Sequence, residues 1–125
     1  MKWYVLESWL LLLRLECVMH FGGLEKLKEA VRRQSVTAMQ SSAVHPYADL
    51  CSAMDYACVL YFKHVLCLQR SCATALLLRR YGWAADLVIG AQILPPASHA
   101  WVEVDGAVVN DKPYMTEIYQ VLDRC

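Results

Sequence analysis

The segment His99-Ala100-Trp101-Val102-Glu103-Val104-Asp105-Gly106 has the alternation of a half-buried β-strand that runs into a tight turn. Its even-numbered strand residues form one apolar face, and the odd-numbered ones form the other. Asp105-Gly106 is a dipeptide typical of hairpin turns, and the apolar run Ala107–Asn110 predicts the returning strand. A β-hairpin near the C-terminus is therefore the centre of the predicted sheet.

Two further segments complete this sheet. Ala85–Gln92 is a β-type run, and Pro95-Pro96 separates it from the hairpin. Met115–Leu122 alternates enough to predict a fourth strand at an edge.

The chain before the sheet is helical in pattern. Apolar periodicity predicts helices over Trp3–His20, Leu24–Arg33, Ala48–Phe62 and Cys67–Tyr81, with Gly22-Gly23 ending the first and Gly82 the last. Gln34–Pro46 lacks periodicity and predicts a flexible connection. The clustered basic residues are expected on solvated helix faces: Lys26, Lys28, Arg32, Arg33, Arg79 and Arg80.

This order predicts an α+β fold, with N-terminal helices followed by a small antiparallel sheet. At 125 residues the chain fits a single domain, with a helical N-terminal part (1–46) and a core (47–125) that carries the candidate site. Twelve basic and twelve acidic residues balance, which provides no electrostatic case for nucleic-acid binding. Apolar residues make up 58%, so we expect a partner to cover part of the surface.

The cysteines and the N-terminus indicate the compartment. None of the six cysteines forms a CxxC pair, and several lie in apolar helical runs, where free thiols behave as small hydrophobes. The apolar stretch Trp3–Leu15 is too short to span a membrane, and as a signal peptide it contains Glu7 and lacks a cleavage site. We therefore expect a cytoplasmic protein with reduced thiols that does not span a membrane.

Three residues form a candidate catalytic set. Cys67 opens a predicted helix, where exposed N–H groups and the positive dipole end stabilise a thiolate, and Arg70 adds positive charge. A cysteine nucleophile needs a base and the base needs an orienting group, which His99 and Asp111 could provide. From its residue type alone, Cys67 is more often a core residue.

The hairpin turn decides whether His99 can meet Asp111. With a two-residue turn, Val104 pairs with Ala107, and Asp111 points away from His99. With a three-residue loop and a bulge at Gly106, Asp111 lies directly opposite His99. The chemistry therefore predicts the bulged loop, and Asn110 is the orienter in the other register.

Other assignments are weaker. His64 is a rival base three residues before Cys67. A metal site made of His64, Cys67 and Cys72 lacks a fourth ligand, so neither a metal nor a cofactor is expected. The oxyanion hole would use the Cys67 N–H and a second donor, for which Gln69 is a candidate.

Four segments together resemble the leader peptidase of lasso peptide biosynthesis, the transglutaminase-like B protein or its stand-alone C-terminal half. They are Cys67–Ser71, Leu77–Gly82, Leu87–Gly90 and His99–Gly106. The spacing of Cys67, His99 and Asp111 is also similar to the family's Cys–His–Asp set. The resemblance implies a papain/transglutaminase-like core.

The resemblance also implies an activity and partners. The protein would remove the leader from a ribosomally made precursor peptide, with Cys67 as nucleophile, His99 as base and then acid, and Asp111 as orienter. A separate winged-helix protein would recognise the leader, and an ATP-dependent lasso cyclase would receive the core peptide. Acyl transfer by the same triad and a non-catalytic binding module remain alternatives.

Overall fold

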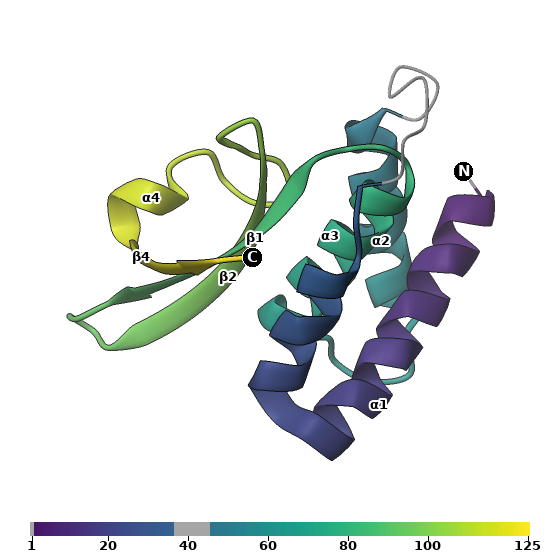
Figure 1. The fold of residues 1–125 in the computed structure, drawn as a ribbon, viewed down its shortest axis with the longest axis horizontal. Helices are drawn as coiled ribbons and strands as arrows, with labels where there is room; N and C mark the ends of the chain where they lie inside the picture. Colours follow the sequence, from purple (N-terminus) through teal and green to yellow (C-terminus); the bar gives the residue numbers. More distant parts are fainter. Residues whose placement is uncertain (1, 37–45) are drawn as a thin grey trace.

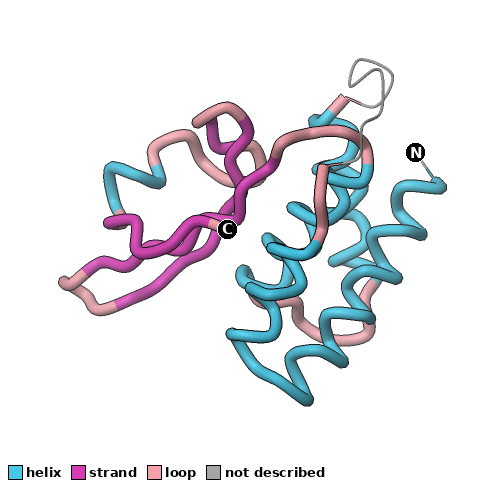
Figure 2. The backbone as a smooth tube through the Cα atoms, in the orientation of Figure 1, coloured by secondary structure: helices cyan, strands magenta, loops and turns pink. Residues whose placement is uncertain are grey.

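The computed structural model describes residues 2–36 and 46–125, in which helices form one layer and an antiparallel sheet lies beside it (Figures 1 and 2). This arrangement confirms the predicted α+β fold. Most of the predicted connection Gln34–Pro46 lies outside the described residues. The elements are α1 (Lys2–Arg33), α2 (Tyr47–Leu60), α3 (Cys67–Arg80), β1 (Ala85–Gln92), β2 (Ala97–Val104), β3 (Ala107–Val108), α4 (Met115–Ile118) and β4 (Gln120–Arg124).

Helix α1 is kinked at the predicted break. Gly23 has φ 66° and ψ −158°, a backbone conformation that strongly favours glycine, and it divides α1 into a first arm (residues 2–22) and a second arm (24–33). Figure 1 shows the two arms diverging from the kink as a V. Both arms bury leucines against the rest of the helical layer, among them Leu12, Leu15 and Leu27. No helix in the described part of the chain is both long and apolar enough to cross a bilayer.

Helix α3 is the centre of the helical layer. Every residue from 71 to 79 is buried, because α1 and α2 pack on this helix from one side and the sheet packs from the other. Its C-terminus is closed by hydrogen bonds from Gly82 N–H to Arg79 O (3.2 Å) and from Trp83 N–H to Leu78 O (3.0 Å). The predicted end at Gly82 is confirmed, and the buried helix holds Cys67 at its other end.

The prediction that Arg79 is solvated was wrong. Its guanidinium is buried and donates to Ala85 O (2.8 Å), Cys125 O (2.7 Å), Gln34 O (3.2 Å) and Val31 O. These carbonyls belong to segments that meet at the C-terminal end of α3. A cation is retained in the core here because backbone carbonyls satisfy its donors.

The strands follow the order β3-β2-β1-β4. One face of the sheet contributes Leu87, Ala100 and Val102 to the main core against the helices. The other face forms a smaller cluster around Val88, Trp101 and Met115. The sheet therefore has apolar residues on both faces, and its outer face is covered by the chain that precedes β4.

The predicted strand Met115–Leu122 is instead a helical turn followed by a strand. Residues Met115–Ile118 form α4, and β4 then pairs with β1 as the predicted edge strand. Met115 and Tyr119 both pack on the outer-face cluster. A helical turn separates them by about 6 Å of rise, whereas a strand would separate them by about 13 Å, so the helix lets both reach it.

The hairpin turn has two residues, so the predicted bulged loop was wrong. Val104 pairs with Ala107 and Glu103 with Val108, while Asp105 and Gly106 have φ values of 53° and 79°. Two positive φ values are typical of a type I′ turn, whose twist matches that of the flanking strands. Strand β3 also ends at Val108, earlier than the predicted Asn110.

Candidate active site

The candidate site lies where the chain leaves the sheet after β3. Val109 N–H donates to Val102 O at 3.0 Å, but the next ladder bond is replaced by a side chain, because Val102 N–H donates to Asn110 Oδ1 at 2.7 Å. Asn110 Nδ2 donates to Ser71 Oγ (3.1 Å), and Ser71 Oγ donates to Ala100 O (3.0 Å). The open edge of β2 is thus bound to the first turns of α3.

This exit from the ladder places Asp111 beside His99. Asp111 no longer follows the strand register, and its Oδ2 lies 2.5 Å from His99 Nε2. The predicted contact between the two residues is present, although the predicted turn that was to produce it is not. Asn110 is not the orienter in this structure, because its amide binds Val102 and Ser71 instead.

Asp111 is held as a carboxylate. Burial alone would raise its pKa, but the hydrogen bonds from His99 and the Lys112 N–H, together with the charge of Arg70, more than offset burial and lower the pKa below its usual value. The Lys112 N–H lies 2.8 Å from Asp111 Oδ1, and Arg70 Nη2 lies 3.9 Å from Oδ2. The carboxylate contacts Nε2 of His99 and can therefore hold the ring in a fixed orientation.

Cys67 is the first residue of α3, as predicted, and no acidic side chain lies in the first turn. Cys67 and His99 line the same pocket of about 110 Å³, together with Leu24, Leu68 and Ile89 among others. The described structure contains no hydrogen bond between the thiol and the ring. Because Asp111 binds Nε2, Nδ1 is the ring nitrogen left to serve the thiol.

A second pocket is also lined by Cys67. It has a volume of about 390 Å³ and is also lined by Cys58, His64 and Arg70. The rival base His64 is therefore near Cys67, but it is exposed, and no carboxylate orients it among the described residues. No group of three or more His, Cys, Asp or Glu side chains in the described chain is arranged to hold a metal ion.

Aromatic rings support His99 from its own face of the sheet. Trp101 was expected on that face, and its ring centroid lies 6.2 Å from that of His99 at an interplanar angle of 28°. Sequence reasoning missed Tyr119, which stacks on His99 at 5.4 Å and 23°. Tyr119 reaches the ring only because α4 replaces the predicted strand, and the pattern of residues 115–122 gave no signal for that helix.

Glu103 is a buried carboxylate that sequence reasoning also left without a role. It accepts hydrogen bonds from Trp101 Nε1 (2.9 Å) and Arg124 Nη1 (2.6 Å), which hold Trp101 beneath the histidine. Arg124 is the last residue of β4, so this ion pair also joins β2 to the edge strand.

The suggested oxyanion donor Gln69 does not face the pocket. Its side chain is buried against α1, where Nε2 donates to Leu12 O (2.9 Å) and Glu16 Oε1 (3.2 Å). Its helical position, two residues after Cys67, turns it toward α1, which a sequence-local argument could not detect. The backbone N–H groups at the start of α3 remain as the donors nearest to Cys67.

All six cysteines lie in the described part of the chain, and all are free thiols. Burial raises the pKa of Cys51 and of Cys72 to about 12. Burial also raises the pKa of Cys58 and of Cys125. These four thiols therefore stay protonated at neutral pH.

The structure thus places a cysteine at the start of a buried helix, near a sheet whose strand β2 carries His99, and Asp111 contacts that histidine from the segment after β3. The chain belongs to the transglutaminase-like superfamily, whose family model matches residues 10–124. It is also similar to the microcin J25-processing protein McjB of Escherichia coli, with 43% identity over 56 residues. That alignment covers 45% of this chain and 27% of the length of McjB. No solved structure matches the chain.

Proposed function

We propose that this chain is a cysteine peptidase that removes the leader from the precursor of a lasso peptide. The observation that carries the proposal is that His99 contacts Asp111 at 2.5 Å and also lines a pocket together with Cys67. Membership of the transglutaminase-like superfamily supports thiol chemistry, and similarity to a microcin-processing protein supports the class of substrate.

In the proposed reaction, the Nε2–H group of His99 donates a hydrogen bond to Asp111 and keeps its proton. Nδ1 then carries no proton and can take one from the Cys67 thiol. The thiolate attacks the carbonyl carbon at the leader–core junction and forms a C–S bond. His99 then gives its proton to the amide nitrogen as the C–N bond breaks and the core peptide leaves.

The leader is now bound to Cys67 as a thioester. A water molecule loses a proton to His99 and attacks the thioester carbonyl, the C–S bond breaks, and the leader departs with a C-terminal carboxylate while the thiol is restored. The N–H groups at the start of α3 stabilise the oxyanion in both steps, because they have no intrahelical partners and lie at the positive end of the helix dipole.

The proposal extends to partners and compartment. A separate winged-helix protein would present the leader, and an ATP-dependent lasso cyclase would use the freed core. The six free thiols favour a reducing compartment such as the cytoplasm.

Mass spectrometry of a candidate precursor, incubated with the protein and the recognition partner, tests the activity. We expect cleavage at one junction by the wild type and none by Cys67→Ala. His99→Ala should also abolish cleavage, whereas His64→Ala should retain it. Cleavage that survives in Cys67→Ala would overturn the assignment of the nucleophile, and loss in His64→Ala alone would overturn that of the base.

Acyl transfer is the second candidate, because the chain belongs to a transglutaminase-like superfamily and an amine could attack the same thioester in place of water. Adding a primary amine to the cleavage reaction distinguishes the two. A peptidase yields a leader with a free carboxylate, whereas an acyltransferase yields the leader amide at the expense of the acid. If neither the leader acid nor the leader amide forms, a binding role would replace both activities.

A further inference from the structure

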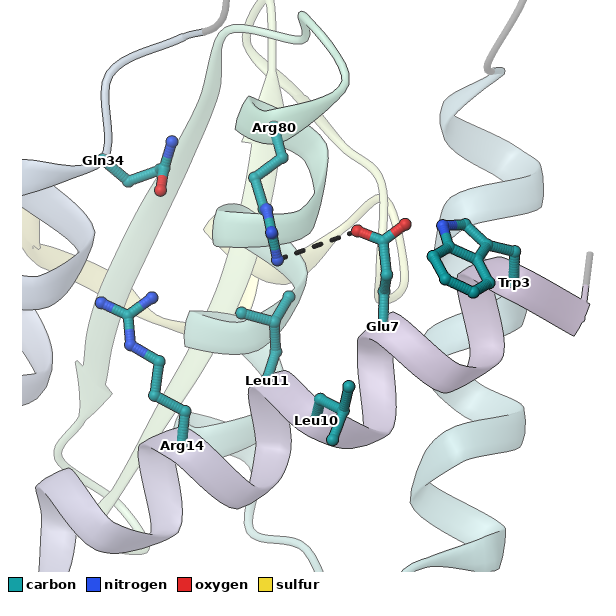
Figure 3. A pocket seen from close by; sticks show the side chains of 7 residues that line it. All are labelled: Trp3, Glu7, Leu10, Leu11, Arg14, Gln34 and Arg80. Atoms are coloured by element: carbon teal, nitrogen blue, oxygen red, sulfur yellow. Dashed lines mark ion pairs between the residues drawn. The ribbon is translucent and has the colours of Figure 1, made fainter.

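A groove lies between the two arms of α1, outside the proposed catalytic site. Its outer part is a pocket of about 650 Å³ next to the N-terminal turns of the first arm, lined by Trp3, Glu7 and Leu10 among others (Figure 3). Its inner part is a pocket of about 190 Å³ closer to the kink, lined by Val18, Lys26 and other residues. Arg14 lines both pockets and joins them, and we call the two together the inter-arm groove.

The inter-arm groove has more cationic than acidic side chains. Four cationic side chains line it (Arg14, Lys26, Arg33 and Arg80), against two acidic ones (Glu7 and Glu29). Both acids are already satisfied within the protein. Glu29 pairs with Lys26 at 3.7 Å and with Arg33 at 2.6 Å, and Glu7 pairs with Arg80 at 3.8 Å and accepts a hydrogen bond from the Tyr81 hydroxyl.

Arg14 makes no ion pair with any described residue, and it is exposed at the junction of the two pockets. In Figure 3 its guanidinium extends into the space between the first arm and Gln34. Apolar side chains accompany it, since Trp3 is 66% exposed and Leu10 is 51% exposed. The groove therefore offers a free guanidinium beside apolar surface, which complements a peptide that alternates acidic and apolar side chains.

The kink of α1 lies next to the pocket of Cys67. Leu24, the first residue after the kink, lines the pocket that Cys67 and His99 share. The kinked end of the V thus adjoins the proposed active site. The ten residue steps from Arg14 to Leu24 include the kink at Gly23 and correspond to at most about 15 Å of helical rise, which an extended peptide spans with about five residues.

We propose that the inter-arm groove binds an acidic stretch of the leader, about five or more residues upstream of the bond that Cys67 attacks. This inference rests on the proposed function for the identity of the peptide. The leader is the half that stays attached as the thioester, so a second contact would hold the acyl-enzyme in place until water resolves it. Such a contact would also select substrates by a feature far from the junction.

Binding can be measured without cleavage, on the Cys67→Ala protein. The probes are two fluorescein-labelled octapeptides, one alternating glutamate with leucine and one alternating glutamine with leucine, titrated by fluorescence anisotropy. We expect the acidic probe to bind more tightly, with a preference that falls at high salt. Arg14→Gln should weaken the binding of the acidic probe by roughly fivefold and leave the affinity for the neutral probe unchanged.

Arg32→Gln is the matched control. It removes the same charge from the same helix, at an exposed residue that faces Asp123 of β4 and does not line the groove. It should leave the preference for the acidic probe unchanged. Equal losses of affinity for the acidic probe in the two variants would indicate a general charge effect. If the Cys67→Ala protein shows no preference for the acidic over the neutral probe, the groove is not an acidic-peptide site. Either result overturns the proposal.

A cleavage assay then tests which half of the substrate uses the groove. Glutamates placed about five residues before the junction should lower KM relative to glutamines, and Arg14→Gln should remove this difference. An equal benefit from glutamates placed after the junction would overturn the assignment to the leader. If the anisotropy preference is present but no precursor is cut, the groove stands as a peptide site and the proposed peptidase fails.

Discussion

Gly90 lies directly opposite His99 in the β1–β2 ladder, and the missing side chain of Gly90 makes room for the aromatic rings that support the histidine. A Cβ atom built at Gly90 would lie 2.7 Å from Cη2 of Trp101 and 2.9 Å from Cβ of Tyr119. Neither contact is possible without displacement. The stack of His99 on Tyr119 and Trp101 therefore depends on a glycine in the neighbouring strand.

Gly90→Ala should accordingly impair catalysis more than folding. The displaced rings release His99, and we expect kcat to fall about tenfold or more, with a loss of stability of about 1–3 kcal/mol. Gly106→Ala is the control, because its positive φ makes alanine unfavourable by about 1 kcal/mol at a turn far from the rings. Steady-state kinetics and thermal unfolding separate the two effects. Equal kcat values in the two variants would contradict a role for Gly90 in positioning His99.

Asp111→Asn should abolish most of the activity and change the acid stability. The folded pKa of Asp111 is lowered, so its carboxylate stabilises the fold above the usual aspartate pKa of about 3.9, and this contribution is lost as the pH falls through the lowered value. The variant should thus be less stable than the wild type at pH 7, with a difference that closes in acid. We expect kcat to fall by about 100-fold or more.

Asp123→Asn provides the comparison for this prediction. The hydrogen bond from Lys28, together with nearby positive charge, outweighs burial and lowers the pKa of Asp123 as well, on an edge strand away from His99. Its stability should show the same sign of pH dependence, while its kcat stays at the wild-type value. Urea unfolding at pH 3 to 7 and precursor cleavage at pH 7 measure the two quantities. A similar fall in kcat for both variants would remove the special role of Asp111.

Alkylation should distinguish Cys67 from the core thiols. The four cysteines with raised pKa values should resist iodoacetamide at pH 7 in the folded protein, leaving Cys67 and the exposed Cys17 as targets. In a Cys17→Ser background we expect one rapid carbamidomethylation, at Cys67, slowed by His99→Ala. Peptide mapping by mass spectrometry locates the label. Labelling of Cys67 that is no faster than that of the core cysteines, or is indifferent to His99, would argue against an activated thiol.

Local patterns were sufficient for much of this fold. Helix α3 begins at the predicted Cys67 and ends one residue before the predicted Tyr81, and β1 has its predicted bounds, because apolar periodicity and Gly82 act within a few residues. The contact between His99 and Asp111 was predicted from chemical need rather than from pattern. It formed by a different route, since Asn110 ends the ladder and frees Asp111 from its register.

Contacts between distant segments could not be predicted in this way. Tyr119 reaches His99 because Met115 is buried under the sheet, and Gln69 faces α1 because α3 is covered on several sides. Both outcomes depend on which elements surround a residue, and neither leaves a local signature. Arg79 is the extreme case, since a basic residue in the last turn of a helix is ordinarily a favourable surface charge.

Arg79→Met should therefore destabilise the protein strongly, whereas Arg80→Met should not. The Arg79 guanidinium satisfies carbonyls of α1, β1 and the C-terminus, and its removal leaves buried acceptors without donors. We expect a loss of about 2–4 kcal/mol, against less than about 1 kcal/mol for the half-exposed Arg80. Chemical denaturation of both variants at neutral pH gives the comparison. If the two losses are equal, the carbonyl cluster around Arg79 is not what holds the end of α3 to the sheet.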